Sequence, residues 1–313
     1  MSAEAQTCAS VLMVRPANFG FNAQTAGSNV FQNADSAALA SSSSAAAVRE
    51  FDALAGTLQD AGVRVIVGAD TVQPIKPDAV FPNNWVSFHA DGTVVLYPME
   101  APNRRLERRE DLILQVAREG NFRILRTIDL TAHEAQQKFL EGTGSLVLDR
   151  PGRLAYACSS SRTQLDALAD FAQVLDYRVV SFDALGLDGS PVYHTNVVMS
   201  VGKSFAVLCA ESIPSPESRA SVMALLRDTG HELVDISMAQ MQCFAGNLLE
   251  LDSRKGPVIA ISALAWEHLD AAQRRVLEAH GSIVAARIPT IERIGGGSVR
   301  CMLAEIHLPR AHA

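Results

Sequence analysis

Residues 51–67 read FDALAGTLQDAGVRVIV, and this stretch contains the pattern that decides the fold. Its first part, residues 51–62, is an amphipathic sequence that predicts a helix. Gly62 lies at the end of that helix, where glycine readily adopts the left-handed conformation that caps a helix C-terminus. The β-branched run at residues 63–67 then predicts a strand. The stretch therefore predicts a helix that leads directly into a strand.

The same helix-to-strand pattern occurs five times along the 313 residues. The junctions fall at positions 62, 120, 177, 230 and 281, which are 58, 57, 53 and 51 residues apart. The predicted helices are 51–62, 112–120, 165–177, 222–230 and one that ends at 281, and the strands that follow them are 63–67, 122–125, 178–182, 232–236 and 282–286. A period this regular indicates five copies of one structural unit.

Further strands are predicted after each junction, at residues 93–99, 145–149, 196–201, 248–252 and 299–306. Each unit is thus of ββαβ type. Such a unit buries its apolar face only against its neighbours, so five of them predict a closed α/β propeller with fivefold pseudosymmetry, formed by residues 1–313 as a single domain. An open, doubly wound sheet would place phosphate-binding glycines after an early strand, and the sequence has none there.

The composition favours a folded protein that acts on a small molecule. Hydrophobic residues make up 48% of the chain and charged residues 19%. The formal net charge of −7 and the scattered basic residues, with one local cluster at 104–109, argue against a nucleic-acid partner. No apolar run reaches the roughly 20 residues of a membrane span, and the first residues lack the pattern of a secretion signal. We therefore expect a cytoplasmic protein without a membrane partner, and a homo-oligomer remains open.

The five cysteines show no close pairs, and neither they nor the histidines have the spacing of metal ligands. We expect free thiols, no metal and no cofactor.

One residue in each unit falls just before the inner strand, at a chemically notable side chain: Asn84, Glu141, His194, Asn247 and Cys301. Successive members are 57, 53, 53 and 54 residues apart. Equivalent positions in a cyclic array lie on one ring around the axis, so we expect these side chains to converge. A thiol, an imidazole and a carboxylate that meet in this way are the groups that nucleophilic catalysis requires.

Taken singly, each of these residues has a plainer interpretation. Cys301 would be a small buried hydrophobic residue, His194 a hydrogen-bonded core histidine, and Glu141 a capping or surface glutamate. The glycines at 295–297, before Cys301, would be a flexible turn, or a place where Gly296 and Gly297 let the backbone approach a ligand and offer amide donors. The shared ring position favours the catalytic interpretation.

Five short motifs carry a resemblance to a known family: Phe81-Pro82-Asn83-Asn84-Trp85, Glu141-Gly142-Thr143-Gly144, His194-Thr195-Asn196, Gly246-Asn247 and residues 295–301. Together they resemble the guanidino-group-modifying superfamily, the penteins, which includes arginine deiminase, dimethylarginine dimethylaminohydrolase and amidinotransferases. The resemblance implies an α/β propeller in which Cys301 is the nucleophile and His194 the acid and base. It implies that Glu141 binds a substrate nitrogen or assists proton transfer.

The two amides of the ring, Asn84 and Asn247, are expected to hold the substrate, and the resemblance adds Asn196 and two arginines to the substrate-binding residues. Arg162 matches an arginine that binds the substrate carboxylate, and Arg104 is a looser match. From the residues alone, Arg162 could equally be a surface residue early in a helix.

Two departures from the deiminase pattern bear on the substrate. Deiminases and amidinotransferases have aspartates where this chain has Asn84 and Asn196. An asparagine offers an acceptor and a donor, which matches a neutral ureido group better than a cationic guanidinium. Each lost charge-assisted contact is worth roughly 1.5–3 kcal/mol, which disfavours arginine against citrulline. The chain thus most resembles the citrulline utilization hydrolases, which convert citrulline to ornithine, ammonia and carbon dioxide.

Two other functions stay open. One is an arginine deiminase or dihydrolase that acts on a guanidino group. The other is a binding protein of the same fold without catalytic activity.

Overall fold

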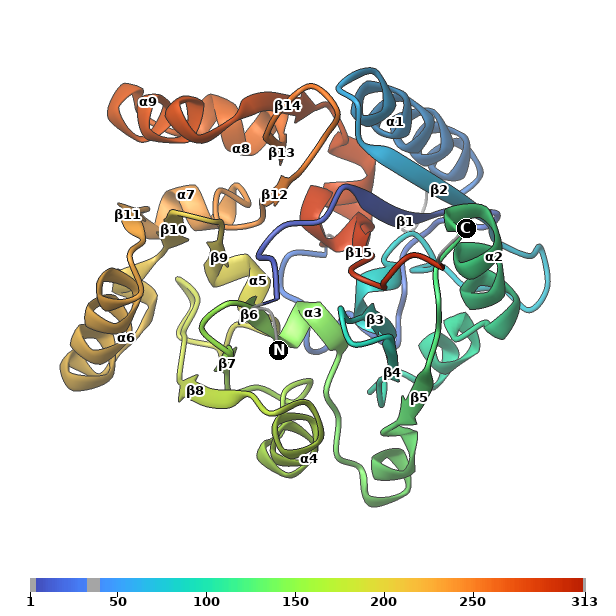
Figure 1. Cartoon of the computed structure of the whole chain (residues 1–313), viewed down its shortest axis with the longest axis horizontal. Helices are drawn as coiled ribbons and strands as arrows, with labels where there is room; N and C mark the ends of the chain where they lie inside the picture. Colours follow the sequence, from blue (N-terminus) through green and yellow to red (C-terminus); the bar gives the residue numbers. More distant parts are fainter. Residues whose placement is uncertain (1–3, 33–39, 312–313) are drawn as a thin grey trace.

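The computed structural model describes residues 4–32 and 40–311, with side chains from Ser43 onward in the second range. Five small sheets of three strands each surround a central axis (Figure 1). In each sheet the middle strand is antiparallel to the strand nearest the axis and parallel to the outer one. The predicted fivefold α/β propeller of ββαβ units is therefore confirmed.

Four sheets are built from consecutive strands: β3 (Val86–Phe88), β4 (Thr93–Leu96) and β5 (Arg126–Asp129); β6 (Val147–Asp149), β7 (Leu154–Cys158) and β8 (Arg178–Phe182); β9 (Met199–Val201), β10 (Phe205–Leu208) and β11 (Glu232–Asp235); β12 (Leu249–Leu251), β13 (Val258–Ser262) and β14 (Ser282–Ala286). The fifth sheet joins the two ends of the chain, because β15 (Ala304–Glu305) pairs with β1 (Ser10–Arg15), which pairs with β2 (Arg64–Ala69). This pairing closes the ring.

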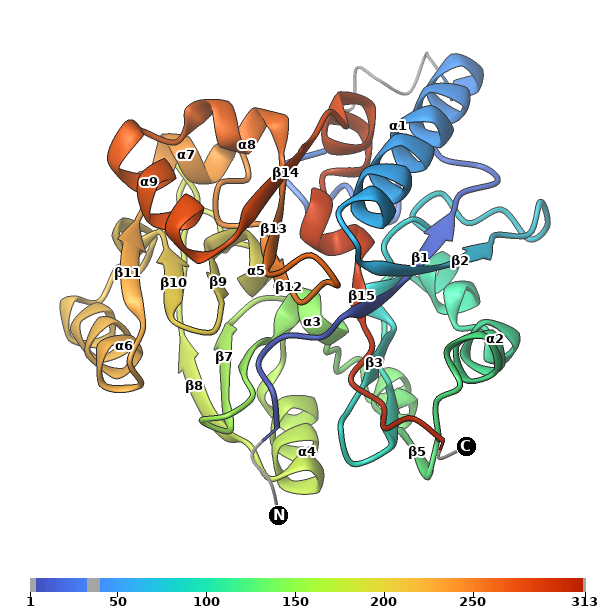
Figure 2. The same ribbon diagram turned by 45° about the horizontal axis from the view of Figure 1, so that its top comes forward.

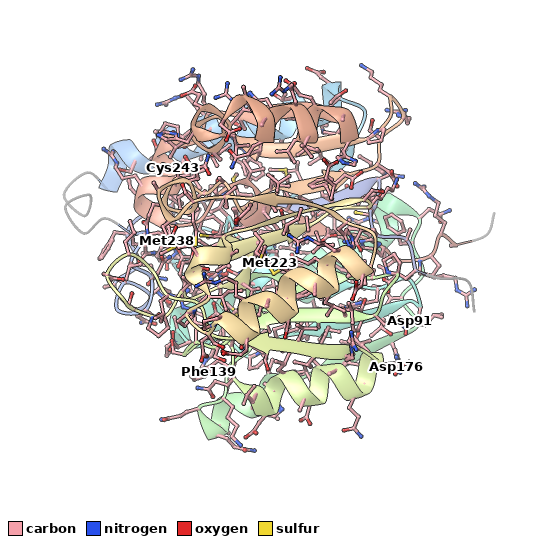
Figure 3. The ribbon with its side chains drawn as sticks, turned by 90° about the vertical axis from the view of Figure 1, so that its left-hand side faces the viewer. Asp91, Phe139, Asp176, Met223, Met238 and Cys243 are labelled. Carbon is pink, nitrogen blue, oxygen red and sulfur yellow. The ribbon has the colours of Figure 1, made fainter. Side chains whose placement is uncertain are left out.

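A helix connects the middle strand to the outer strand of every sheet and lies on the outside of the ring (Figures 1 and 2). These helices are α1 (Ala40–Asp60), α2 (Glu110–Gly120), α4 (Leu165–Leu175), α6 (Pro216–Asp228) and α9 (Ala271–His280). Their apolar faces pack on the sheets; Met223 of α6, for example, packs against the core beneath that helix (Figure 3). No helix in the described part of the chain is long and apolar enough to cross a membrane.

The predicted glycine caps are only partly correct. Gly62 and Gly230 have φ values of +93° and +87°, so they adopt the left-handed conformation. At the second and third junctions Asn121 and Asp176 adopt it instead, with φ values of 53° and 56°. Short polar side chains tolerate this conformation because they can hydrogen-bond to the nearby backbone. Gly281 is extended, with φ −178°.

The predicted strands need three corrections. Residues 122–125 precede β5 rather than form it, and residues 93–99 contain the middle strand of their sheet, since the prediction missed the inner strand β3. Two predicted inner strands begin with a helical turn, α5 (Thr195–Val198) and η7 (Val299–Met302), before β9 and β15. Short apolar runs do not distinguish a strand from a buried helical turn.

Candidate functional site

A one-turn helix precedes the inner strand in four of the five units: η2 (Pro82–Asn84), α3 (Gly142–Ser145), α5 and η7. In the fourth unit the chain makes a turn after α7 (Met238–Gln242) that ends at Asn247. These turns bring the five predicted ring residues, Asn84, Glu141, His194, Asn247 and Cys301, close to the axis. Each of the five is buried.

Two glycines in α3 allow the close approach of neighbouring units. A Cβ atom on Gly142, which has φ +47°, would lie 2.2 Å from the carbonyl oxygen of Asn83. A Cβ atom on Gly144 would lie 2.5 Å from Nδ2 of Asn84 and 2.7 Å from the imidazole of His194. The missing side chains of α3 therefore let Asn84 and His194 both approach α3 closely.

Glu141 and His194 form a buried pair. Nε2 of His194 lies 2.9 Å from Oε2 of Glu141. Burial alone would raise the pKa of the Glu141 carboxyl, but Arg162, His194 and Arg104 outweigh burial and hold the pKa well below its usual range. Burial lowers the pKa of His194 to about 4, although Glu141 acts in the opposite direction. A neutral imidazole thus faces an ionised carboxylate. Since a carboxylate only accepts, the Nε2 proton points to Glu141 and Nδ1 keeps a lone pair that can take a proton.

Cys301 has two amide groups beside its sulfur. Nδ2 of Asn247 lies 3.4 Å and Nδ2 of Asn196 3.5 Å from Sγ. The Asn196 Oδ1 atom is 3.8 Å from the same sulfur. Asn196 and Asn247 were predicted to bind substrate, and the structure places both against the thiol.

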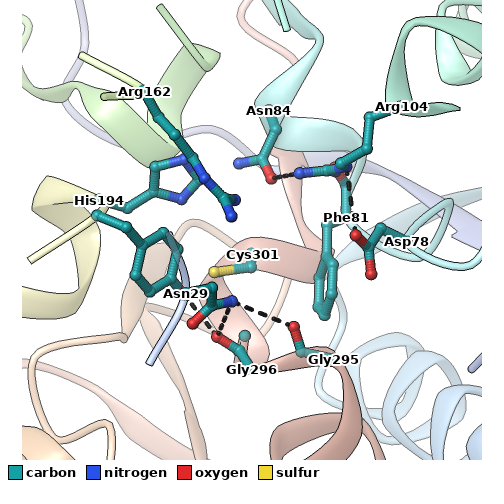
Figure 4. Close-up of a pocket in the computed structure, with 12 residues that line it drawn as sticks. Asn29, Asp78, Phe81, Asn84, Arg104, Arg162, His194, Gly295, Gly296 and Cys301 are labelled. Atoms are coloured by element: carbon teal, nitrogen blue, oxygen red, sulfur yellow. Dashed lines mark hydrogen bonds and ion pairs between the residues drawn. The ribbon is translucent and has the colours of Figure 1, made fainter. Parts of the chain in front are cut away.

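A small pocket lies beside the thiol (Figure 4). It is lined by Asn29, Asp78, Phe81, Asn84, Arg104, Arg162, Tyr193, His194, Gly295, Gly296, Gly297 and Cys301. Of the predicted site residues, Glu141, Asn196 and Asn247 do not line this pocket. Glu141 contacts the pocket residue His194, and Asn196 and Asn247 contact the pocket residue Cys301.

Both predicted arginines are buried in the pocket wall, where each already has protein partners. Nη1 of Arg104 donates to Oδ1 of Asn84 at 2.8 Å, and its Nη2 pairs with Glu107 at 2.9 Å. Nη2 of Arg162 donates to the carbonyl oxygen of Thr25 at 2.9 Å and to the hydroxyl of Ser28 at 2.8 Å. The surface interpretation of Arg162 is wrong, because its side chain is only 2% exposed.

Two residues that the sequence did not predict, Asp78 and Asn29, also line the pocket. Asp78 is buried in the pocket wall, and its Oδ1 atom has no hydrogen-bond partner among the described residues. Burial raises the pKa of this carboxyl despite the nearby Arg104 and Arg162. Nδ2 of Asn29 donates to the carbonyl oxygens of Gly295 and Gly296 and so holds the glycine loop. The position of Asp78, three residues before the motif that begins at Phe81, was the signal available for it.

Within the described ranges, no group of three or more His, Cys, Asp or Glu side chains is arranged to hold a metal ion.

Comparison with known proteins agrees with this architecture. A model of the family described as N,N-dimethylarginine dimethylhydrolase, eukaryotic, matches residues 15–308. Comparison with curated proteins gives no match.

Three solved structures illustrate the likeness. The apo structure of ArgZ, an arginine dihydrolase from the ornithine-ammonia cycle in cyanobacteria, has a TM-score of 0.74 at 18% identity, and the match covers 96% of this chain but 41% of ArgZ. The substrate-bound N-terminal domain of ArgZ has a TM-score of 0.73 at 18% identity, with 96% and 99% covered. Dimethylarginine dimethylaminohydrolase in an adduct with S-methyl-L-thiocitrulline has a TM-score of 0.63 at 14% identity, with 95% and 99% covered. The chain thus spans about two-fifths of full-length ArgZ. At these identities the likeness establishes the fold.

Proposed function

The chain belongs to the N,N-dimethylarginine dimethylhydrolase family, eukaryotic, and from this premise we propose that it hydrolyses the ureido group of citrulline to give ornithine, ammonia and carbon dioxide. The observation that carries the choice of citrulline is the pair of neutral amides in the site, Asn84 in the pocket lining and Asn196 against the nucleophile. Asn84 and Asn196 stand where a cationic substrate would favour carboxylates. Among the described residues, no carboxylate has a hydrogen bond to the Cys301 sulfur. A neutral ureido group needs no such partner.

The proposed reaction begins at the sulfur. His194 takes the proton of the Cys301 thiol, and the thiolate attacks the ureido carbon to form a tetrahedral oxyanion. Gly297 and the amide of Asn84 line the pocket and can donate to this oxyanion, whereas the N–H of Gly296 already donates to the carbonyl oxygen of Glu292. The C–N bond to the terminal nitrogen breaks as His194 returns the proton, and ammonia leaves. A thiocarbamoyl enzyme remains.

Water completes the cycle. His194 removes a proton from a water molecule that attacks the thiocarbamoyl carbon, and the C–S bond breaks to release the thiolate and a carbamate. The carbamate decomposes to ornithine and carbon dioxide without further catalysis. Glu141 touches neither reacting atom in this scheme. It orients His194 and stabilises the imidazolium that forms at each proton transfer.

The amino-acid end of the substrate has partners of the right charge in the pocket wall. Arg104 and Arg162 supply guanidinium groups for the carboxylate. Oδ1 of Asp78, which has no hydrogen-bond partner among the described residues, is suited to the α-ammonium group. This arrangement supports an amino acid as the substrate class.

A second candidate is hydrolysis of the guanidino group of arginine. The comparisons favour it over citrulline, because the similar structures include those named as an arginine dihydrolase, one of them bound to its substrate. The family name points to methylated arginines, which also carry a guanidino group, as substrates. One observation argues against arginine and methylated arginines alike: position 84 carries a neutral amide and not a carboxylate that could pair with the guanidinium.

The deciding experiment measures ammonia and ornithine released from citrulline, arginine, dimethylarginine, agmatine and N-carbamoyl amino acids in parallel. The proposal expects ornithine from citrulline and no release by Cys301→Ala. Turnover of arginine or dimethylarginine alone would reject the ureido proposal in favour of the guanidino candidate. Absence of turnover with every compound would support the binding protein without catalytic activity.

A further inference from the structure

Asn247 is a buried amide whose orientation is set by two backbone groups. Its Oδ1 atom accepts the backbone N–H of Arg300 at 3.0 Å, and its Nδ2 atom donates to the carbonyl oxygen of Asn196 at 2.9 Å. Turning the amide by 180° would place its NH₂ group against an N–H and its oxygen against a carbonyl. The orientation is therefore determined by the backbone rather than by the thiol.

This orientation leaves one amide hydrogen of Asn247 for the Cys301 sulfur, 3.4 Å away. Asn196 is arranged similarly, since its Nδ2 atom donates to the carbonyl oxygen of Thr143 at 3.2 Å and lies 3.5 Å from Sγ. The two asparagines differ in one respect. Asn196 also presents an oxygen to the sulfur, which can accept the S–H of the neutral thiol, whereas Asn247 presents only a donor.

A partner that only donates favours the thiolate over the thiol, because a thiolate accepts hydrogen bonds and has none to give. The hydrogen-bond partners of the Cys301 sulfur among the described residues are the neutral amides of Asn196 and Asn247. His194 is predominantly neutral near pH 7, since burial lowers its pKa to about 4. No hydrogen bond joins His194 to Cys301 within residues 4–32 and 40–311. The groups in direct contact with the sulfur before any proton transfer are therefore neutral amides.

We propose that Asn247 is a catalytic residue of this chain, which stabilises the Cys301 thiolate through its fixed amide hydrogen and does not bind substrate. This inference rests on the proposed role of Cys301 as nucleophile, and it changes the role that the sequence predicts for Asn247. The location of Asn247 supports this role, because the residue does not line the pocket and is fully buried behind the sulfur.

The test is the rate of Cys301 alkylation by iodoacetamide from about pH 5 to about pH 10, followed by mass spectrometry of the Cys301 peptide. This readout separates Cys301 from the other cysteines; burial raises the pKa of Cys8 and Cys158 to about 12 and that of Cys209 to about 11. Asn247→Ala removes the donor and should raise the midpoint of the profile by about one pH unit.

Asn247→Asp keeps the shape of the side chain and should raise the midpoint by about two pH units. When ionised, this carboxylate repels the thiolate. When protonated, it gives its single hydrogen to the carbonyl oxygen of Asn196 and leaves the sulfur without the donor. In turnover assays at neutral pH, both variants should lower kcat about tenfold or more and leave KM unchanged.

The matched control is Ser298→Ala. The hydroxyl of Ser298 donates to Oε1 of Glu292 at 2.7 Å and does not bond to the sulfur. Its removal should therefore loosen the same loop without removing a donor from the sulfur. Its alkylation midpoint should equal that of the wild type. Profiles of both Asn247 variants that coincide with the wild type, or an equal shift in Ser298→Ala, would overturn the proposal. Alkylation needs no substrate, so this result is independent of whether citrulline or arginine is turned over.

Discussion

His194 and Glu141 meet through a single 2.9 Å contact between Nε2 and Oε2, and only the histidine reaches the pocket. The carboxylate is fully buried and is also near Arg162 and Arg104, with Nη1 atoms 3.5 Å and 3.7 Å from the same oxygen. The arrangement fixes the tautomer of the imidazole, with Nδ1 left as the proton acceptor. Four predictions follow from this site.

Glu141→Gln should lower kcat by about 10²–10⁴-fold with little change in KM, because the amide can accept from Nε2 but cannot stabilise an imidazolium. The variant should also change the pKa of His194. Burial lowers this pKa and Glu141 raises it, so loss of the Glu141 carboxylate should lower the pKa further. Steady-state kinetics and an NMR titration of His194 check both points. An unchanged kcat would mean that proton transfer does not depend on this pair.

Folding stability should depend on pH through His194. The unfolded imidazole takes a proton below about pH 6.5, whereas the folded one remains neutral down to about pH 4. The unfolded state therefore binds more protons between these values, and this contribution to stability is lost as the pH falls, by up to about 3 kcal/mol. Glu107, whose pKa burial raises to about 7, acts with the opposite sign over much of the same range.

The measurement is the difference between wild type and His194→Asn in the free energy of unfolding from about pH 7 to about pH 4.5. Glu107 contributes equally to both proteins and cancels. The wild type should lose more stability than the variant as the pH falls. Parallel curves would show that His194 protonates equally in both states.

Gly144→Ala should abolish most activity, because the new methyl group would meet Asn84 and His194 at 2.5 Å and 2.7 Å. Displacement of either group by about 1 Å should cost about 10²-fold in kcat/KM, and overpacking should cost about 1–3 kcal/mol of stability. Gly56→Ala in α1 is the control, since a methyl group there meets nothing within 4 Å. It should leave activity unchanged and raise stability by about 0.5–1 kcal/mol. Equal activity of the two variants would contradict the tight contact.

Asn84→Asp should shift preference towards cationic substrates. The new carboxylate lies beside Arg104, whose Nη1 atom now donates to Asn84 at 2.8 Å, so part of its charge is already balanced. We expect the ratio of kcat/KM for arginine to that for citrulline to rise about tenfold. Asn84 is the better test than Asn196, whose amide lies on the sulfur. A ratio that does not change would remove the main argument for a neutral substrate.

The spacing of the helix-to-strand junctions predicted the fivefold ring, since repeat period and hydrophobic pattern are local properties of the chain. The ring in turn predicted that Asn84, Glu141, His194, Asn247 and Cys301 would lie together, because equivalent positions in a closed array share one radius. The local conformation of these positions was less predictable. Thr195 to Val198 form a helical turn although two valines favour a strand, because packing around the axis outweighs propensity.

The sequence by itself determined which reactive residue types occupy the ring. Only the tertiary structure decided how they are divided between the pocket and its support. Asn247 and Cys301 are 54 positions apart and occupy equivalent positions of the repeat. Cys301 nevertheless lines the pocket, whereas Asn247 lies behind its sulfur. Asp78 and Asn29 enter the site from loops outside the repeat pattern. Such placements depend on contacts between side chains distant in sequence, which no local pattern records.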